Sequence, residues 1–324
     1  MRVIERLKGE NMKKIVVIGS INMDLVTVCE RAPEGGETLF GTEFFQVPGG
    51  KGANQAVTMG KMGCDVTMLG MVGNDIFGKE LLSSMKDSGV NVDFVEKTDC
   101  STGIAKIIVE KNGQNRILVV PGANGCVDRE YIDRHMDIIK GCDIVVAQLE
   151  IPVDTVEYAF EKAKELGKIT ILNPAPGREL SAKIIKNSDI IVPNESELGL
   201  ITGMATDKEE EILKAGKKLM DMEVKSLIVT LGSKGSLYLD NKKVKFCPAY
   251  RVNAVDTTAA GDSFIGGLVT KMDKDCDDSI IDAISFATKV SAIAVTRKGA
   301  QTSIPTLEEV ENFVGELKEE VWER

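Results

Sequence analysis

The feature that most constrains the fold of this chain is an alternation of short, almost purely apolar runs with amphipathic stretches. An apolar run at Ile15–Ile18 precedes a helical pattern from Gly52 to Met62, and a run at Val66–Met71 precedes a helical pattern from Ile76 to Ser88. Strands without polar alternation are typical of parallel sheets covered on both faces. Further runs of this kind are Ile144–Gln148, Ile169–Leu172, Ile190–Val192 and Leu227–Thr230. The alternation predicts a three-layer αβα fold with a mainly parallel central sheet.

Two segments, 26–47 and 103–120, interrupt this alternation with short pieces typical of antiparallel strands. The second contains Lys111-Asn112-Gly113-Gln114 between two apolar runs, which is a hairpin signal. Glycine-rich stretches then return the chain to the main domain. We therefore expect a small β-sheet lid formed by 26–47 with 103–120, on an α/β domain formed by 12–25, 48–102 and 121–320.

The two ends of the chain carry separate expectations. Residues 259–272 and 279–296 have helical patterns, and the acidic segment Leu307–Glu319 is expected to be a surface helix. Residues 1–11 are charged and lack the apolar core of a signal peptide. We expect them to be a non-native or disordered leader, with Met12 as the natural start.

Composition narrows the classes of function. The formal net charge is −10 with a pI near 5.0, which disfavours binding to nucleic acid or to an anionic membrane. Seven cysteines without a CxxC spacing indicate neither a disulfide framework nor a zinc site, so we expect a cytoplasmic protein. The single histidine, His135, lies in a polar helical stretch and is expected to be solvated. Proton chemistry is therefore expected from carboxylates or lysine.

The segment from Asp256 to Phe264 is the most informative for chemistry. Small residues there lead into a helix whose first N–H groups and dipole would attract an anion, with the Asp262 carboxylate in the first turn. The alternative is an ordinary helix start capped by Thr257 or Thr258. The chain has no GxxxxGK[ST] loop, and the first strand is not followed by GxGxxG, so a dinucleotide-binding dehydrogenase is disfavoured.

A second glycine-rich turn into a helix, Gly49–Ala56, carries Lys51 and Asn54. Together with Gly63, Gly73 and the Asp262 segment, its spacing resembles the paired signatures of the PfkB carbohydrate-kinase family. The resemblance extends over roughly residues 13–313. The segments that agree in order are 19–24, 148–152, 173–176, 193–197, 230–235 and 295–301. The helix-start motif reads Ala-Ala-Gly-Asp where many relatives have Gly-Ala-Gly-Asp.

The resemblance implies the αβα fold of that family and ATP-dependent phosphorylation of D-ribose at its 5-hydroxyl, giving D-ribose 5-phosphate and ADP. Asp262 would be the general base, with the N–H groups of Ala259, Ala260 and Gly261 stabilising the transferring phosphoryl group. The sugar would be held by Asn22, Met23, Asp24, Gly49, Gly50, Lys51, Gly52, Asn54, Glu150 and Asp262. The nucleotide would be held by Asn194, Glu197, Thr230, Leu231, Gly232, Ser233, Lys234, Gly235, Gly261 and Thr288.

The resemblance also implies two metal ions and a homodimer. Asn194 and Glu197 would organise Mg²⁺ and the phosphates through water. A K⁺ ion would be surrounded by Asp256 and Ser303 with carbonyl oxygens of Thr258, Ala294, Arg297 and Gly299. A second copy would pair through the β lid.

Several alternatives stay open at this point. The same chemistry could act on fructose or a deoxyribose, and a non-catalytic sugar-binding regulator could keep the fold. Intact Asp262 and Lys51 argue against that loss of function. Arg297 and Lys298 could bind phosphate instead of lying beside a cation.

Overall fold

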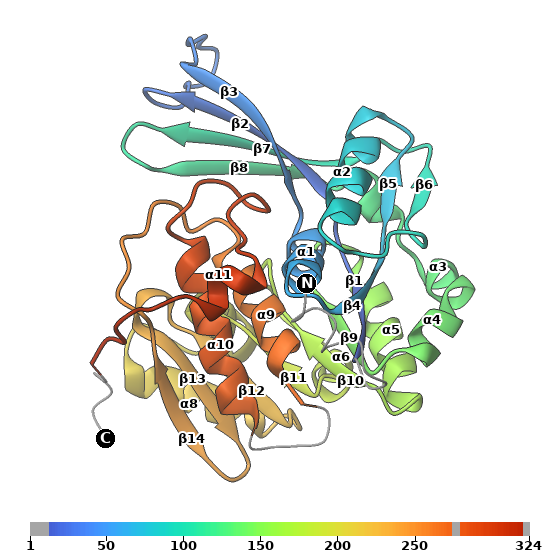
Figure 1. Ribbon diagram of the computed structural model, residues 1–324, viewed down its shortest axis with the longest axis vertical. Coiled ribbons are helices and arrows are strands. Elements are labelled where there is room, and N and C mark those ends of the chain that lie inside the picture. The colour runs from blue at the N-terminus through green and yellow to red at the C-terminus, as the bar shows by residue number, and fades with distance from the viewer. Residues whose placement is uncertain (1–12, 274–278, 320–324) are drawn as a thin grey trace.

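The protein is described by a computed structural model that covers residues 13–273 and 279–319, so the expected leader 1–11 lies outside the described residues. Its largest sheet has eight strands in the order β14-β13-β12-β11-β10-β9-β1-β4 (Figure 1). The strands are β1 (Lys14–Ile18), β4 (Asp65–Leu69), β9 (Ile144–Ala147), β10 (Ile169–Leu172), β11 (Ile190–Ile191), β12 (Ser226–Thr230), β13 (Gly235–Asp240) and β14 (Val244–Pro248).

The expected mainly parallel sheet is confirmed. All neighbouring pairs from β4 to β12 are parallel, whereas β12, β13 and β14 form an antiparallel edge. The sequence reasoning assigned no strand to 235–248. The β13–β14 pair therefore extends the sheet beyond the predicted elements.

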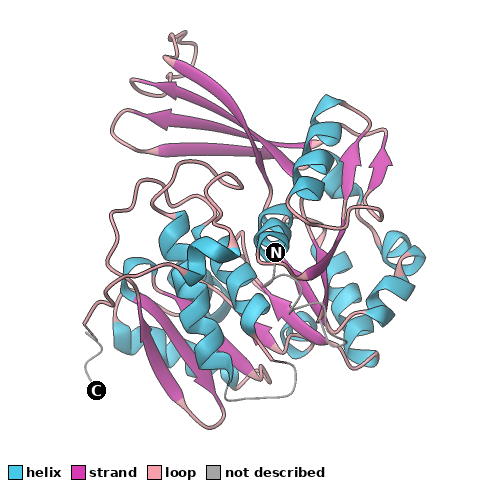
Figure 2. Cartoon of the chain, in the orientation of Figure 1, coloured by secondary structure: helices cyan, strands magenta, loops and turns pink. Residues whose placement is uncertain are grey.

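Helices cover both faces of this sheet (Figure 2). Along β1, Ile15 and Val17 point into one core and Val16 and Ile18 into the other, as the alternation of a strand requires. The first core is closed by α1 (Lys51–Lys61), α2 (Ile76–Asp87), α9 (Ala260–Lys271) and α10 (Ser279–Ala294). The second is closed by α3 (Arg129–Arg134), α4 (Met136–Gly141), α5 (Val153–Glu165), α6 (Ala182–Lys186), α7 (Glu195–Thr202) and α8 (Glu209–Met220). The three-layer prediction is confirmed.

A separate four-stranded sheet extends away from the main body (Figure 1). Its order is β3-β2-β7-β8, with β2 (Asn22–Cys29), β3 (Glu43–Gly49), β7 (Gly103–Glu110) and β8 (Asn115–Val120). Strand β2 pairs parallel to β7, in a register that sets Asn22 beside Gly103. The short strands β5 (Met71–Gly73) and β6 (Glu96–Thr98) pair separately, and the 3₁₀ helix η2 (Gly122–Cys126) follows β8.

Two local expectations were wrong. The helix expected over Leu307–Glu319 is only α11 (Leu307–Glu311), because the following chain pairs with the segment after β14. There Leu317 bridges Tyr250, and the N–H of Lys318 donates to the carbonyl of Ala249.

His135 is not solvated, since only 15% of its side chain is exposed. Its ring packs edge-on against Tyr131 and Phe94, and its Nε2 lies 2.9 Å from a carboxylate oxygen of Glu96. Its role is structural, at the junction of α3 and α4. Among the residues described, no helix combines the length and apolar character that a membrane span requires.

Candidate active site

Asp262 lies in the first turn of α9 with only 6% of its surface exposed. Its Oδ2 accepts a hydrogen bond from Nδ2 of Asn54 at 3.0 Å, and its Oδ1 accepts one from Nε2 of Gln55 at 3.0 Å. Both donors lie on α1, so two helix starts meet at this carboxylate. The residue before α9, Ala259, is left-handed with φ 59°. The N–H of Ala260 donates to the carbonyl of Thr257, so it is occupied within the loop.

The side chains expected to hold a sugar come toward Asp262 from three parts of the chain. Asn22 and Asp24 are on β2, Lys51 and Asn54 are in the first turn of α1, and Glu150 follows β9. A carboxylate oxygen of Glu150 accepts from the backbone N–H of Lys51 at 3.1 Å and from the Ser20 hydroxyl at 2.6 Å. These contacts tie the end of β9 to the start of α1.

The glycines of this region let the backbones approach closely. Gly50 precedes α1 with φ 90°, and a Cβ there would lie 2.7 Å from the backbone nitrogen of Asn22. Gly49 ends β3 against the carboxylate of Asp24, and the N–H of Gly52 donates to the Ser20 hydroxyl. Met23 lies among them in sequence, but its side chain packs in the core.

The electrostatics of this cluster are dominated by crowded carboxylates around one ammonium group. Burial raises the pKa of Asp24 to about 7, and the charges of Glu150 and Asp262 add to the rise. Burial acts to lower the pKa of Lys51, but surrounding carboxylates, Asp262 first, outweigh it and the pKa is raised. Lys51 is therefore a cation in a pocket of acceptors, which suits binding of a polyol.

Asn124 is a site residue that the sequence reasoning missed. It is 1% exposed in η2, and its Nδ2 donates to Oδ1 of Asn22 at 2.6 Å. Its amide also bonds the N–H and carbonyl of Ile21. The oxygen of Asn22 is thus occupied, so the hydrogen bonds that Asn22 can still offer are those of its NH₂ group. Asn124 lies in one of the glycine-rich stretches that return the chain from the lid, residues 121–124, and nothing in the pattern of that stretch indicates this contact.

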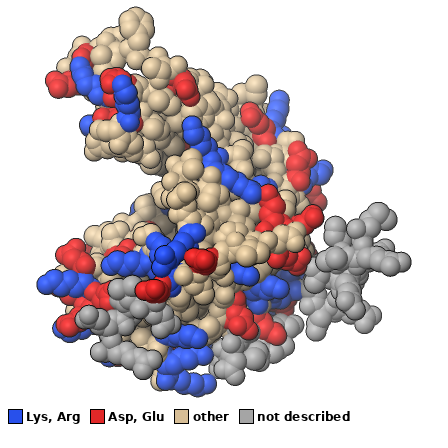
Figure 3. Space-filling model, turned by 60° about the vertical axis from the view of Figure 1, so that its left-hand side comes forward, with Lys and Arg blue, Asp and Glu red and all other residues tan. Residues whose placement is uncertain are grey.

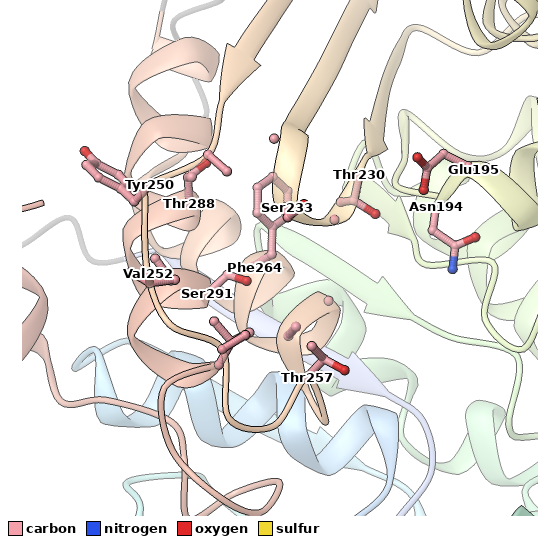
Figure 4. A pocket seen from close by; sticks show the side chains of 18 of the residues that line it. Asn194, Glu195, Thr230, Ser233, Tyr250, Val252, Thr257, Phe264, Thr288 and Ser291 are labelled. Atoms are coloured by element: carbon pink, nitrogen blue, oxygen red, sulfur yellow. The ribbon is translucent and has the colours of Figure 1, made fainter. Parts of the chain in front are cut away.

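A pocket of about 730 Å³ opens beside the first turn of α9 (Figure 4). Seven of the expected nucleotide residues line it: Asn194, Thr230, Gly232, Ser233, Gly235, Gly261 and Thr288. Leu231 is buried in the core, and Lys234 is exposed outside the pocket. The sequence reasoning missed its less polar end, which is lined by Tyr250, Val252, Phe264, Ser291, Ala292 and Val295.

Asn194 and Glu197 form a capping box at the start of α7 beside this pocket. Oδ1 of Asn194 accepts from the N–H of Glu197 at 2.8 Å, and a carboxylate oxygen of Glu197 accepts from the N–H of Asn194 at 2.9 Å. Burial raises the pKa of Glu197, partly opposed by this N–H and by Lys51. A bridge between Asn194 and Thr230 joins α7 to the end of β12.

The residues expected around a monovalent cation come from two loops that Asp256 connects. One oxygen of Asp256 accepts from the N–H of Thr258 at 2.9 Å and the other from the N–H of Gly299 at 2.9 Å. Ser303 is fully buried and donates to the carbonyl of Ala300.

The side chains of Arg297 and Lys298 do not take part in the pocket. The guanidinium of Arg297 pairs with Glu309 at 2.7 Å, and neither Arg297 nor Lys298 is among the pocket-lining residues. This arrangement disfavours the alternative in which both residues bind phosphate. The carbonyl of Ala294 accepts from the N–H of Arg297 at 3.1 Å.

Comparison with known proteins identifies the family of this chain. The model of the pfkB family carbohydrate kinases matches residues 12–307. A ribokinase of Schizosaccharomyces pombe is 43% identical over 311 residues, which cover 93% of this chain and 97% of the relative. A deoxyribokinase of Salmonella typhi is 41% identical over 304 residues, 93% of this chain and 98% of the relative.

Solved structures give the same answer for the fold. The Arabidopsis thaliana ribokinase complexed with ribose and ATP matches with a TM-score of 0.87 and 32% identity, over 94% of this chain and 100% of that chain. The sequence-based resemblance is confirmed. The chain therefore belongs to the PfkB family of carbohydrate kinases and is a sugar kinase that uses ATP.

Proposed function

We propose that this sugar kinase transfers the γ-phosphoryl group of ATP to the 5-hydroxyl of D-ribose, giving D-ribose 5-phosphate and ADP. The position of Asp262 carries the proposal. Its carboxylate accepts a hydrogen bond from Asn54, which belongs to the polar cluster formed by Asn22, Asp24, Lys51, Asn54 and Glu150. Gly261, one residue before Asp262, lines the large pocket. A sugar hydroxyl in the cluster and a phosphate in the pocket would thus meet at one carboxylate. Ribokinases among the relatives support ribose as the acceptor.

Asp262 is proposed as the general base. It takes the proton from the 5-hydroxyl as the oxygen forms its bond to the γ-phosphorus and the bond to the leaving ADP oxygen breaks. First-turn N–H groups of a helix have no carbonyl partner within the helix, so those of α9 that stay unoccupied would donate to the incoming phosphoryl group. Since the N–H of Ala260 is held by Thr257, Gly261 is the stronger candidate donor.

The remaining cluster is proposed to hold the sugar. Asp24 and Glu150 would accept hydrogen bonds from hydroxyls, and Lys51 with the NH₂ group of Asn22 would donate them. Asn54 would give up its bond to Oδ2 of Asp262 in favour of the sugar. These groups sit at the ends of strands and in the first turn of α1, which keeps their spacing fixed.

Asn194 and Glu197 are proposed to organise a Mg²⁺ ion, most of whose ligands would be water and phosphate. The residues fit the ion in kind, since both offer oxygen ligands: Asn194 lines the pocket, and the buried Glu197, which does not line it, is held beside Asn194 by the capping box. When bound, the ion would neutralise charge on the phosphate oxygens. The side chains hold that region by their capping box.

A monovalent cation is proposed between the two loops joined by Asp256. The residues suit a hard cation in kind, because Asp256 bonds both loops and the other expected ligands are the hydroxyl of the buried Ser303 and backbone carbonyl oxygens. Hydrogen bonds from Thr258 and Gly299 keep the pKa of Asp256 below its ordinary value despite its burial. K⁺ would fix the loop that leads into α9.

The four-stranded sheet is proposed as a lid, formed by 26–47 with 103–120, that also pairs with a second copy. Register places Asp24 next to Ala105 and Ala105 opposite Val119, so these share the face toward the polar cluster. On that face Ile117 is 59% and Val119 43% exposed. A bound pentose is too small to cover all the exposed apolar side chains on this face, so a second copy is proposed to cover the rest. Figure 3 shows the hollow between this sheet and the rest of the molecule.

Deoxyribose is the second candidate acceptor, favoured by the 41% identity to a deoxyribokinase. An ATP-consumption assay over D-ribose, 2-deoxy-D-ribose and D-fructose separates the acceptors. We expect the highest kcat/KM for D-ribose, with product mass and NMR showing phosphate on the 5-oxygen. A higher kcat/KM for either other sugar would overturn the ribose assignment.

A further inference from the structure

Three buried amide side chains form a hydrogen-bonded chain that ends on the proposed base. Nε2 of Gln148, just after β9, donates to Oε1 of Gln55 at 2.6 Å. Nε2 of Gln55 donates to Oδ1 of Asp262 at 3.0 Å and to Oδ1 of Asn173, just after β10, at 3.2 Å. Nδ2 of Asn173 donates to the carbonyl of Val192 at 3.2 Å. Gln55 and Gln148 have no exposed surface and Asn173 has 7%.

A backbone carbonyl fixes the direction of every bond in this chain. The carbonyl of Val192 can only accept, so Asn173 must turn its NH₂ group to it and its oxygen to Gln55. Gln55 then needs its NH₂ group on the side of Asn173 and Asp262, which leaves its oxygen for Gln148. A flipped Gln55 would set its carbonyl oxygen against two acceptors. Both N–H bonds of Gln55 are thus committed, one of them to Asp262.

Burial of these three amide side chains in the core costs free energy. Oε1 of Gln148 is buried and has no hydrogen-bond partner among the residues described. It lies so close to Gly19 that a Cβ at that position would be 2.1 Å away. Burying an unsatisfied amide oxygen is unfavourable, and apolar side chains would pack there without that cost. The benefit of the three amides must therefore come from the group that they hold in place. Their series of hydrogen bonds ends on the Asp262 carboxylate.

We infer that Gln55 is a positioning residue for phosphoryl transfer: it fixes Oδ1 of Asp262 and so turns Oδ2 toward the sugar hydroxyl. The inference rests on the proposed role of Asp262 as base. The terminal torsion of an aspartate is soft, and one directed donor removes that freedom. Gln55 is wholly buried and offers Asp262 only a donor, so it neither touches the sugar nor accepts the proton. It acts through the orientation of the carboxylate.

A double-mutant cycle tests this inference. Gln55→Met keeps the side-chain volume and removes the donor, and it is made in the wild type and in Asp262→Asn. In the wild type, kcat is expected to fall by ~10–100-fold with the KM of the sugar changed by less than ~3-fold, because misplacing a reacting group costs mainly turnover. In Asp262→Asn, the same change is expected to lower the residual kcat by less than ~3-fold.

Gln148→Met is the matched control, because it removes another amide of the chain and leaves the bond from Gln55 to Asp262 in place. It is expected to lower kcat less than Gln55→Met does. Gln55→Glu keeps the shape and serves if the methionine variant does not fold, and it should lose at least as much kcat because it sets an acceptor against Asp262. Equal losses in Gln55→Met and Gln148→Met, an undiminished loss in Asp262→Asn, wild-type kcat in Gln55→Glu, or a pure KM effect would each overturn the inference.

The cycle also separates this inference from the proposed function. It is run with whichever sugar the wild-type enzyme phosphorylates best, so a preference for deoxyribose would overturn only the ribose assignment. Near-normal turnover in Asp262→Asn would overturn the base and the inference with it. Loss of turnover in Asp262→Asn together with normal turnover in Gln55→Met would overturn the inference alone.

Discussion

Asp24→Asn is expected to stabilise the ligand-free protein and to weaken its binding of sugar. Burial, with the neighbouring charges of Glu150 and Asp262, raises the pKa of Asp24 from 3.8 to about 7. A rise of that size corresponds to at most ~4 kcal/mol of destabilisation by the ionised carboxylate. Because Lys51 lies near and solvent reaches part of Asp24, we expect the neutral amide to recover about 1–2 kcal/mol.

The pH dependence gives this prediction its sign. With a raised pKa, the folded state holds a proton that the unfolded state releases between about pH 4 and pH 7. The contribution of Asp24 to wild-type stability is therefore most favourable below that window and decreases as the pH rises through it. Asparagine does not titrate. The stability gain of Asp24→Asn should be close to full at pH 8 and less than half of that at pH 5.

Urea unfolding followed by circular dichroism at pH 5 and pH 8, without ligand, measures the effect. Asp137→Asn is the control, since its side chain is 91% exposed, and it should show no gain at either pH. With sugar, the KM of Asp24→Asn should rise by ~10–100-fold, the usual loss for a hydrogen bond to a charged group. A variant less stable than wild type at pH 8, or a gain of the same size at both pH values, would refute the reasoning.

Three further predictions test the proposed machinery. Asp262→Asn should lower kcat by ~10²–10⁴-fold while calorimetry shows sugar and ATP binding retained, and near-normal turnover would contradict a general base. Turnover at constant ionic strength should be higher in K⁺ than in Na⁺ or a bulky organic cation, and Asp256→Ala should abolish that response; equal kcat in all three would count against the cation site. Ile117→Asp should convert a dimer to a monomer in light scattering, while Leu118→Asp, on the opposite face of β8, should not; two dimeric variants would argue against pairing through this face.

The parallel sheet could be predicted from the sequence because its signal is local. The run Ile169–Leu172 matches β10 at both ends, and the other parallel strands differ from their runs by at most two residues. The β13–β14 hairpin was missed even though Asp240–Lys243 is a plausible turn. The prediction of an acidic helix over Leu307–Glu319 was wrong because a non-local contact outweighs the local pattern. The pattern is helical, but pairing of Leu317 with Tyr250 is more favourable than a few further turns of exposed helix.

The residues of the candidate site also divide into those that a local sequence pattern reveals and those that depend on non-local contacts. Lys51, Asn54 and Asp262 could be found because each lies in a short motif at a helix start. Gln55 and Asn124 are also polar side chains at the site. Their hydrogen-bond partners, Asp262 and Asn22, lie more than a hundred residues away in the sequence, so a local pattern does not reveal their roles. The less polar end of the pocket comes mostly from an irregular segment and from α10, where no motif marks the residues; Phe264 of α9 ends the Asp256–Phe264 segment, but nothing in that segment indicates that its ring lines a pocket.

The start of α9 joins these features into one physical account. Ala259 takes a left-handed conformation, which costs a residue with a side chain about 1 kcal/mol. Such strain persists only where surrounding contacts over-determine the backbone, and here Asp256 binds Thr258 on one side and Gly299 on the other. The loop is thus tied to a second loop before it turns into the helix that carries Asp262. We expect a perturbation of that tie to change the direction of the first-turn N–H groups, and so to affect turnover before it affects sugar affinity.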